Sequence, residues 1–212
     1  DAMLVRLARS GYTVVRLKGG DPGLFGRAAE ELAACDRAGI PCEIVPGITA
    51  AVGAAAALRI PLTDRASAQR LQLITGHTRH GQAPEHIWAA LADKSATTAV
   101  YMGTRTLAGM LPQILEAGAD PATPAIAILS ATCPDERVLT GVLRDLPDLI
   151  SPEVGRDAPC LALFGEAMRS YTERQALLAA QDILARPNML AGPDVIARPA
   201  TQAEEEIVAA RA

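Results

Sequence analysis

Aromatic and basic side chains are scarce in this sequence of 212 residues. It contains two phenylalanines, three tyrosines and one tryptophan, and its 20 lysines and arginines are outnumbered by 24 aspartates and glutamates. The formal net charge is therefore −4. Because proteins bind bare nucleic acid through basic patches and aromatic stacking platforms, this composition predicts a protein that does not bind nucleic acid.

Long hydrophobic runs are missing as well. The longest stretch without a charged residue covers residues 44–58, and one proline and two glycines interrupt it. A membrane-spanning helix needs about 20 predominantly apolar residues, so the sequence predicts no membrane segment. Charged residues at Asp1, Arg6 and Arg9 argue against a signal peptide. We therefore expect a soluble, cytoplasmic protein.

The sequence also has no obvious set of metal ligands or disulfide partners. Its four cysteines form no Cys-x-x-Cys pair and are expected to be reduced thiols: Cys35, Cys42, Cys133 and Cys160. The histidines lie close together without cysteines or carboxylates at a familiar ligand spacing: His77, His80 and His86. We predict no metal site.

Half of the residues are apolar, which is ample for a core, and the first part of the chain alternates between strand and helix patterns. Apolar or β-branched runs predict strands at residues 14–18, 42–45 and 71–75. Helices are predicted over residues 2–10, 24–38 and 49–58. This alternation is typical of parallel strands joined by crossover helices.

The second part continues the alternation but includes a hairpin. Strands are predicted at residues 98–102, 125–129, 137–141 and 160–165, and helices at 85–91, 106–117 and 143–149. A hairpin around Pro134-Asp135 would make the second sheet mixed. We predict an α/β protein of two lobes, a mostly parallel N-terminal sheet in residues 1–80 and a mixed C-terminal sheet in 81–168. A polar linker is expected at 75–84 and a helix-prone extension at 169–212.

The loop after the first predicted strand is rich in glycine. Gly19 and Gly20 allow a ligand to approach the backbone closely, because no Cβ intervenes. No Gly-Lys-Ser/Thr follows, so this is not a phosphate loop of the Walker type. The carboxylate of Asp21 suits a cation or sugar hydroxyls. The alternative is a plain tight turn between a strand and a helix.

Two more strand ends could receive a ligand. Pro46-Gly47 leads into a helix whose first amides are free, with Thr49 as its N-cap, although a simple cap is the favoured explanation of this pattern taken alone. Tyr101-Met102-Gly103 closes a predicted strand, which is where α/β proteins bind ligands, although a lone methionine is often core filler.

Together these stretches resemble the tetrapyrrole methylases, and among them the enzymes that methylate uroporphyrinogen III. The resemblance runs from residue 4 to residue 168, in the order and spacing of the segments 14–22, 25–27, 30–32, 39–41, 45–51, 53–56, 60–63, 75–77, 101–103, 131–132, 136–137, 140–141 and 165–166. It implies two α/β lobes with S-adenosylmethionine between them, in a homodimer. An N-terminal portion of the family pattern is not matched, so we expect the family's acid–base residues to lie outside this sequence and assign no catalytic residue.

The resemblance also implies an activity and a set of binding residues. The activity is C-methylation of uroporphyrinogen III at C-2 and C-7 to precorrin-2, for siroheme, cobalamin or heme d1 synthesis, with S-adenosylhomocysteine as the other product. The cofactor residues would be Gly19, Gly20, Asp21, Leu24, Thr49, Ala50, Met102 and Ala131, the last standing where the family often has glycine.

Arg27 would meet a carboxylate of the substrate, or else pair with Glu30 or Glu31. Two other functions remain open for the whole chain. One is methylation of another tetrapyrrole, a precorrin or a protein side chain, and the other is a non-catalytic role as a dimeric member of the family.

Overall fold

The computed structural model of the chain describes residues 1–77, 87–153 and 158–184. The chain divides into two compact units, residues 1–176 and 177–212, and the first of them contains the sheet and the candidate site. Within the described residues, no helix combines the length and the apolar composition that a membrane crossing requires.

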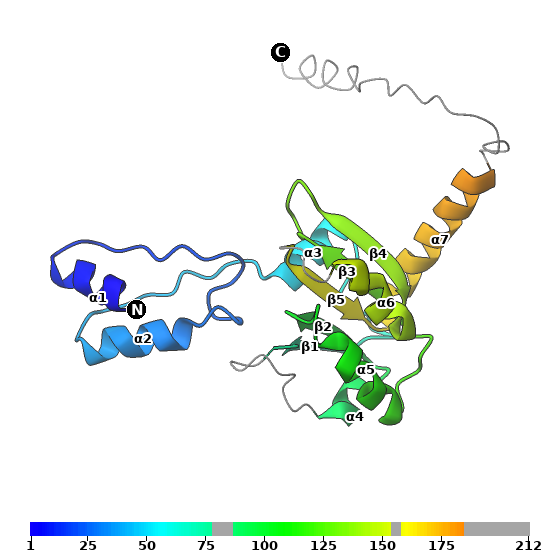
Figure 1. Cartoon of the computed structure of the whole chain (residues 1–212), viewed down its shortest axis with the longest axis horizontal. Helices are drawn as coiled ribbons and strands as arrows, with labels where there is room; N and C mark the ends of the chain where they lie inside the picture. The colour runs from blue at the N-terminus through cyan, green and yellow to red at the C-terminus, as the bar shows by residue number, and fades with distance from the viewer. Residues whose placement is uncertain (78–86, 154–157, 185–212) are drawn as a thin grey trace, which may run out of the picture. The chain divides into compact units, whose positions relative to one another are not determined.

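Three helices come first along the chain, and strands and helices follow one another from β1 to α7 (Figure 1). The helices are α1 (Ala2–Arg9), α2 (Ala28–Arg37), α3 (Ala50–Leu58), α4 (Trp88–Leu91), α5 (Leu107–Glu116), α6 (Leu146–Ile150) and α7 (Arg169–Leu184). The strands are β1 (Arg70–Thr75), β2 (Ala96–Tyr101), β3 (Pro124–Leu129), β4 (Arg137–Val142) and β5 (Cys160–Phe164). Short 3-10 helices cover Leu143–Asp145, Ser151–Glu153 and Glu166–Met168.

The strands form one five-stranded sheet in the order β1-β2-β5-β3-β4. β1 and β2 are parallel, whereas β5 runs antiparallel to both β2 and β3, and β3 and β4 form the predicted hairpin. The predicted α/β class and its mixed sheet are therefore confirmed. The carboxyl end of β2 and the first residue of β5 consequently lie at the same end of the sheet.

Helices cover both faces of this sheet because side chains alternate along each strand. On β3, Ala125 and Ala127 face the core formed with α4, α5 and α6. Ile126 and Ile128 face the opposite core, to which α3 contributes its buried alanines. The apolar, nearly continuous run of β3 is thus explained by burial of both faces.

The two strands predicted near the N-terminus, and with them the mostly parallel N-terminal sheet, are not formed in the described residues. Residues 14–18 and 42–45 are extended but belong to no β-ladder. Val15, Leu17 and Val45 are 81%, 84% and 77% exposed. The prediction of buried strands was wrong here, because a β-branched run becomes a strand only where a neighbouring strand accepts its hydrogen bonds.

The structure also differs from the predicted domain boundaries. β1 was assigned to the N-terminal lobe of residues 1–80, yet it pairs with β2 in the C-terminal sheet. The compact unit ends at residue 176 and not at 168, so the first turns of α7 belong to it. Residues 78–84 of the predicted linker, including His80, lie outside the described residues, as do His86 and residues 185–212 of the extension.

Local backbone conformation explains two further differences. The helix predicted from residue 24 begins at Ala28, because Phe25 and Arg27 adopt the left-handed conformation with φ of 54° and 60°. The strand predicted to include Met102 ends at Tyr101, because Met102 has φ of 54°. Both differences lie in segments that form the candidate site.

Candidate functional site

Asp21 joins two loops that are far apart in the sequence. Its Oδ1 accepts a hydrogen bond from the Gly23 amide at 2.8 Å, and its Oδ2 accepts one from the Gly47 amide at 2.9 Å. The glycine-rich loop of residues 18–27 is thereby fastened to the Pro46-Gly47 turn that precedes α3. The Asp21 carboxylate acts as a clasp between the two loops.

The two glycines at this junction are favoured for different reasons. A Cβ on Gly47 would lie 2.1 Å from the carbonyl oxygen of Gly20, a distance that no side chain tolerates. Gly20 itself has φ of +72°, a conformation that favours glycine. Glycine at position 47 therefore lets the two loops approach this closely, and glycine at position 20 allows the turn.

Hydrogen bonds from the backbone hold the pKa of the Asp21 carboxyl below its ordinary value, first from Gly47 and then from Gly23. The amide of Leu24 acts in the same direction. The carboxylate is therefore ionised at neutral pH. Each of its oxygens has a second lone pair that can still accept a hydrogen bond from a ligand.

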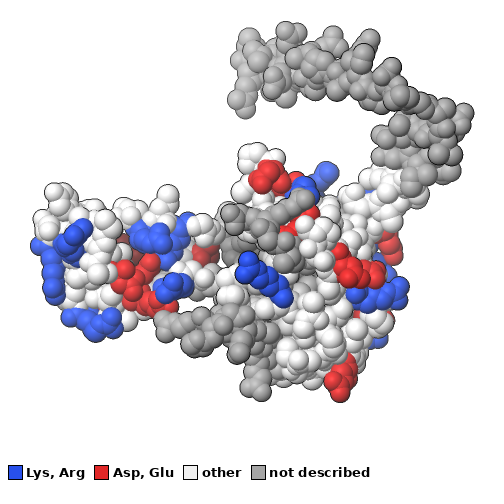
Figure 2. Space-filling view, in the orientation of Figure 1, with Lys and Arg blue, Asp and Glu red and all other residues white. Residues whose placement is uncertain are grey.

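Charged side chains of opposite sign are interspersed along the α1–α2 segment (Figure 2). Lys18 donates a hydrogen bond to the Gly26 carbonyl and pairs with Glu31 at 2.8 Å, which lowers the pKa of Glu31. Arg27 binds Glu30 with two hydrogen bonds of 3.1 and 2.5 Å, and the hydrogen bond to Glu30 raises the pKa of its guanidinium. The predicted ion pair of Arg27 thus exists, with Glu30 as its partner, and the Arg27 side chain is 73% exposed.

The N-terminus of α3 receives its cap from β2. The Tyr101 hydroxyl accepts a hydrogen bond from the Ala51 amide at 3.0 Å and shares another with the Thr49 hydroxyl at 2.7 Å. Thr49 is the N-cap residue by position, but its side chain makes no hydrogen bond to the helix. The predicted role of Thr49 as an N-cap is therefore carried out jointly with a residue of the sheet.

A cavity of about 270 Å³ opens at this end of the sheet. It is lined by Ala50, Tyr101, Met102, Thr104, Ile128, Ser130, Ala131, Cys133 and residues 158–161. None of these lining residues is an acid, a lysine, an arginine or a histidine. Burial raises the pKa of the Cys160 thiol to about 11, so this side chain is also neutral at physiological pH. The cavity wall is apolar with a few hydroxyl and backbone groups.

Left-handed residues surround the cavity. Met102, Ser130 and Thr132 have φ of 54°, 49° and 64°. The Ser130 hydroxyl donates to Asp135 at 2.9 Å, and the Thr132 amide donates to the Glu136 carboxylate at 2.6 Å. Unfavourable backbone conformations of this kind cluster at ligand sites, where the surrounding contacts maintain them.

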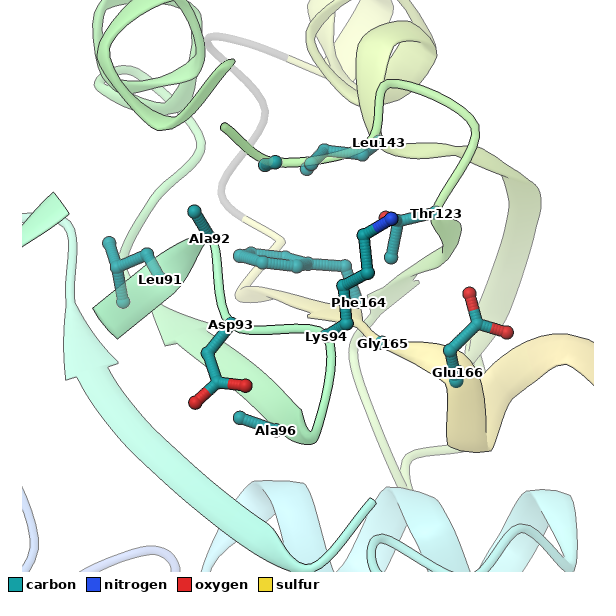
Figure 3. A pocket seen from close by; sticks show the side chains of 11 residues that line it. Leu91, Ala92, Asp93, Lys94, Ala96, Thr123, Leu143, Phe164, Gly165 and Glu166 are labelled. Carbon is teal, nitrogen blue, oxygen red and sulfur yellow. The ribbon is translucent and has the colours of Figure 1, made fainter. Parts of the chain in front are cut away.

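A second cavity lies at the opposite end of β2 and β5, where Phe164 is surrounded by Leu91, Ala92 and Leu143 (Figure 3). Its volume is about 10 Å³, which is enough for one water molecule. This cavity is therefore too small for a cofactor, in contrast to the cavity at the Tyr101 end of the sheet.

The structure brings three of the predicted cofactor residues to the wall of one cavity, namely Ala50, Met102 and Ala131. Thr49 is hydrogen-bonded to Tyr101, which also lines the cavity. Gly20 packs against the Thr49 backbone, and Asp21 binds the adjoining turn. Gly19, Leu24 and Arg27 lie in the same glycine-rich loop but do not line the cavity. Their assigned roles remain predictions.

Sequence reasoning missed the side-chain contacts of Tyr101 and the part played by residues 158–161. The Tyr101 ring also contacts the Phe25 ring, with centroids 5.0 Å apart. The available signal was the scarcity of aromatic residues, since Phe25 lies in the glycine-rich loop and Tyr101 lies directly before Met102-Gly103. Residues 158–161 carry no motif, and only the antiparallel pairing of β5 places them at the cavity.

Comparison with known proteins identifies the family. A family model described as Tetrapyrrole (Corrin/Porphyrin) Methylases matches residues 1–147. A uroporphyrinogen-III C-methyltransferase of Paracoccus denitrificans is 47% identical over 146 residues, which are 69% of this chain and 51% of that protein. A siroheme synthase of Gluconacetobacter diazotrophicus is 45% identical over 170 residues, which are 80% of this chain and 36% of that protein. The chain thus spans about half of the length of the first relative and about a third of the length of the second.

Solved structures agree with this match. A uroporphyrin-III C-methyltransferase from Thermus thermophilus, solved in complex with S-adenosylhomocysteine, superposes with a TM-score of 0.65 and is 32% identical. The match covers 80% of this chain and 73% of that one. The resemblance seen in the loops is confirmed, and the chain belongs to the tetrapyrrole (corrin/porphyrin) methylases.

Proposed function

We propose that this protein binds S-adenosylmethionine in the cavity at the Tyr101 end of the sheet and methylates uroporphyrinogen III at C-2 and C-7. The products would be precorrin-2, a precursor for siroheme or cobalamin, and S-adenosylhomocysteine, and the active form would be a homodimer. The observation that carries the proposal is the joining of Ala50, Met102 and Ala131 in one cavity from three distant segments. The relatives' names and the ligand of the Thermus protein support it.

The properties of the cavity fit this cofactor. Its volume of about 270 Å³ is close to the lower end of small-molecule sites, which span about 300–1,000 Å³. Apolar walls suit the adenosine and thioether parts of the molecule, and the polarisable sulfur of Met102 can contact an aromatic ring. The absence of charged side chains among the lining residues means that a sulfonium would meet no repelling lysine or arginine.

The cofactor supplies a methyl group that its sulfonium charge already activates, so the chain's main task is alignment. Ala50, Met102 and Ala131 would hold it, and Asp21 would keep the two glycine loops together around it. Because the lining side chains are uncharged, the walls solvate a positive charge less well than water does, which favours loss of that charge on methyl transfer. Arg27, whose side chain is exposed, would exchange its partner Glu30 for a substrate carboxylate.

Thermal unfolding with added S-adenosylhomocysteine tests the cofactor part of the proposal. The melting temperature should rise with ligand concentration, as expected for a ligand that binds only the folded state. Ala131→Phe should abolish the rise by filling the cavity. Ala108→Phe, at an exposed position of α5, is the matched control and should leave it intact. No rise at millimolar ligand would contradict the proposal.

The substrate part is tested separately by mass spectrometry. Uroporphyrinogen III incubated with the protein and S-adenosylmethionine carrying a labelled methyl group should yield a product with two labelled methyl groups. A protein that binds the cofactor but labels a different tetrapyrrole would show that the family assignment holds and the proposed substrate is wrong.

A further inference from the structure

The hydroxyl of Tyr101 lies where three segments of the candidate site meet. Tyr101 is the last residue of β2 and lines the cavity, and the next residue, Met102, turns away in the left-handed conformation. Both residues line the cavity, and Tyr101 also contacts the loops that precede α2 and α3.

The contact with α3 satisfies a helix end that would otherwise have free amides. The first amides of a helix have no partner within it. The Tyr101 hydroxyl accepts the hydrogen bond of the Ala51 amide at 3.0 Å and shares a second bond with the Thr49 hydroxyl at 2.7 Å. These two bonds fix the residues on either side of Ala50, the residue through which α3 reaches the cavity.

The ring of Tyr101 makes a separate contact with the glycine-rich loop. The Phe25 ring lies 5.0 Å away, centroid to centroid, at an interplanar angle of 52°, which is a favourable tilted geometry. Phe25 holds φ of 54°, so its backbone is kept in an uncommon conformation. One side chain thus touches the glycine-rich loop with its ring and the N-terminus of α3 with its hydroxyl.

We propose that Tyr101 is a positioning residue for cofactor binding, which acts by holding Thr49, Ala50 and Ala51 in register with Met102. This inference rests on the proposed function. The hydroxyl is the group that acts, because it is hydrogen-bonded both to the Thr49 hydroxyl and to the Ala51 amide. The ring is expected to contribute to stability, and the hydroxyl to the affinity for S-adenosylhomocysteine.

The test is a double-mutant cycle by isothermal titration calorimetry with S-adenosylhomocysteine, on the wild type, Tyr101→Phe, Thr49→Val and the double variant. Tyr101→Phe keeps the ring and should weaken binding about threefold to tenfold, the range for one hydrogen bond. The double variant should bind about as well as Tyr101→Phe alone, because both changes remove one shared network. Tyr12→Phe is the matched control, since Tyr12 is 67% exposed, and should bind like the wild type.

Hydrogen exchange by NMR supplies a readout that does not depend on the ligand. The Ala51 amide should exchange faster in Tyr101→Phe than in the wild type, while the melting temperature of the unliganded protein changes little. A merely structural role would lower the melting temperature and leave the affinity of the folded protein unchanged.

The outcomes separate this inference from the function on which it rests. If the wild type binds the ligand and Tyr101→Phe binds equally well, the inference alone is overturned. If the effects of Tyr101→Phe and Thr49→Val simply add, the hydroxyl does not act through Thr49 and the inference is likewise overturned. If the wild type does not bind the ligand, the proposed function and the inference fall together.

Discussion

At the scale of single residues, Asp21 shows how one ionised group can organise a site. One of its oxygens accepts a hydrogen bond from the amide of Gly23 in its own loop, and the other accepts one from the amide of Gly47, which lies 26 residues further along the chain. The Gly47 hydrogen bond is the main cause of its lowered pKa. The carboxyl pKa is thus a property of the contact between two loops, and protonation weakens that contact.

This gives a prediction about pH. A carboxyl with a lowered pKa in the folded state stabilises the protein above its unfolded pKa of about 4, and the contribution is lost as pH falls through the folded value. Asp21→Asn should lower the melting temperature at pH 7 by about 2–4 °C. The difference in melting temperature between the variant and the wild type should shrink as the pH is lowered below about 4. Differential scanning fluorimetry from pH 7 to pH 3 measures this difference.

Asp36→Asn, at an exposed position of α2, is the control for the loss of one negative charge. It should melt like the wild type at every pH. A constant gap between Asp21→Asn and the wild type from pH 7 to pH 3 would show that the Asp21 carboxylate does not stabilise the loops through its charge.

At the scale of elements, β3 supports the cavity from within the sheet. All six of its residues are buried, and it is hydrogen-bonded to β4 on one side and to β5 on the other. The loop that follows it contains Ser130 and Ala131, which line the cavity. The position of that loop therefore depends on the packing of β3 between two helix-covered faces.

Truncating a side chain of β3 tests how much this packing stabilises the protein. Ile126 is fully buried in the core shared with α3, so Ile126→Ala should destabilise the protein by about 2–5 kcal/mol through lost burial and the resulting cavity. Ile87→Ala removes the same atoms from a side chain that is 79% exposed, and should change stability by less than about 0.5 kcal/mol. Urea unfolding curves of both variants give the comparison, and similar values for the two would contradict the described packing.

At the scale of the molecule, residues 1–176 combine a buried sheet with extended segments that leave apolar side chains in water. Val15, Leu17, Val45 and Ile48 are each at least 70% exposed. Extended backbone with exposed apolar side chains is a template for pairing with other chains. We therefore predict that the protein self-associates through these segments.

Replacing two of these side chains should reduce that tendency. The double variant Val15→Thr/Leu17→Thr keeps β propensity but removes apolar surface, so sedimentation velocity should show less association at high protein concentration. The melting temperature should change little, because neither side chain is buried. Ile87→Thr makes a similar change elsewhere and should not alter association. If the double variant associates as strongly as Ile87→Thr, another surface is responsible for the self-association.

The sequence by itself determined the element types of the C-terminal sheet, its mixed character and the family. Local patterns carried this information: a continuous apolar run for β3, turn residues for the hairpin, and glycines that follow extended segments at Gly19-Gly20 and Met102-Gly103. Patterns of this kind depend on neighbouring residues, so they can be identified without a structure.

Only the tertiary structure decided what each of these residues touches. The clasp from Asp21 to Gly47, the cap from Tyr101 to Ala51 and the uncharged cavity wall all join segments that no local pattern pairs. The same limit explains the wrong prediction at residues 14–18. Propensity describes a segment's own preference for an extended backbone, whereas a strand, a cap or a cavity also requires a partner, and partners are set by the packing of the whole chain.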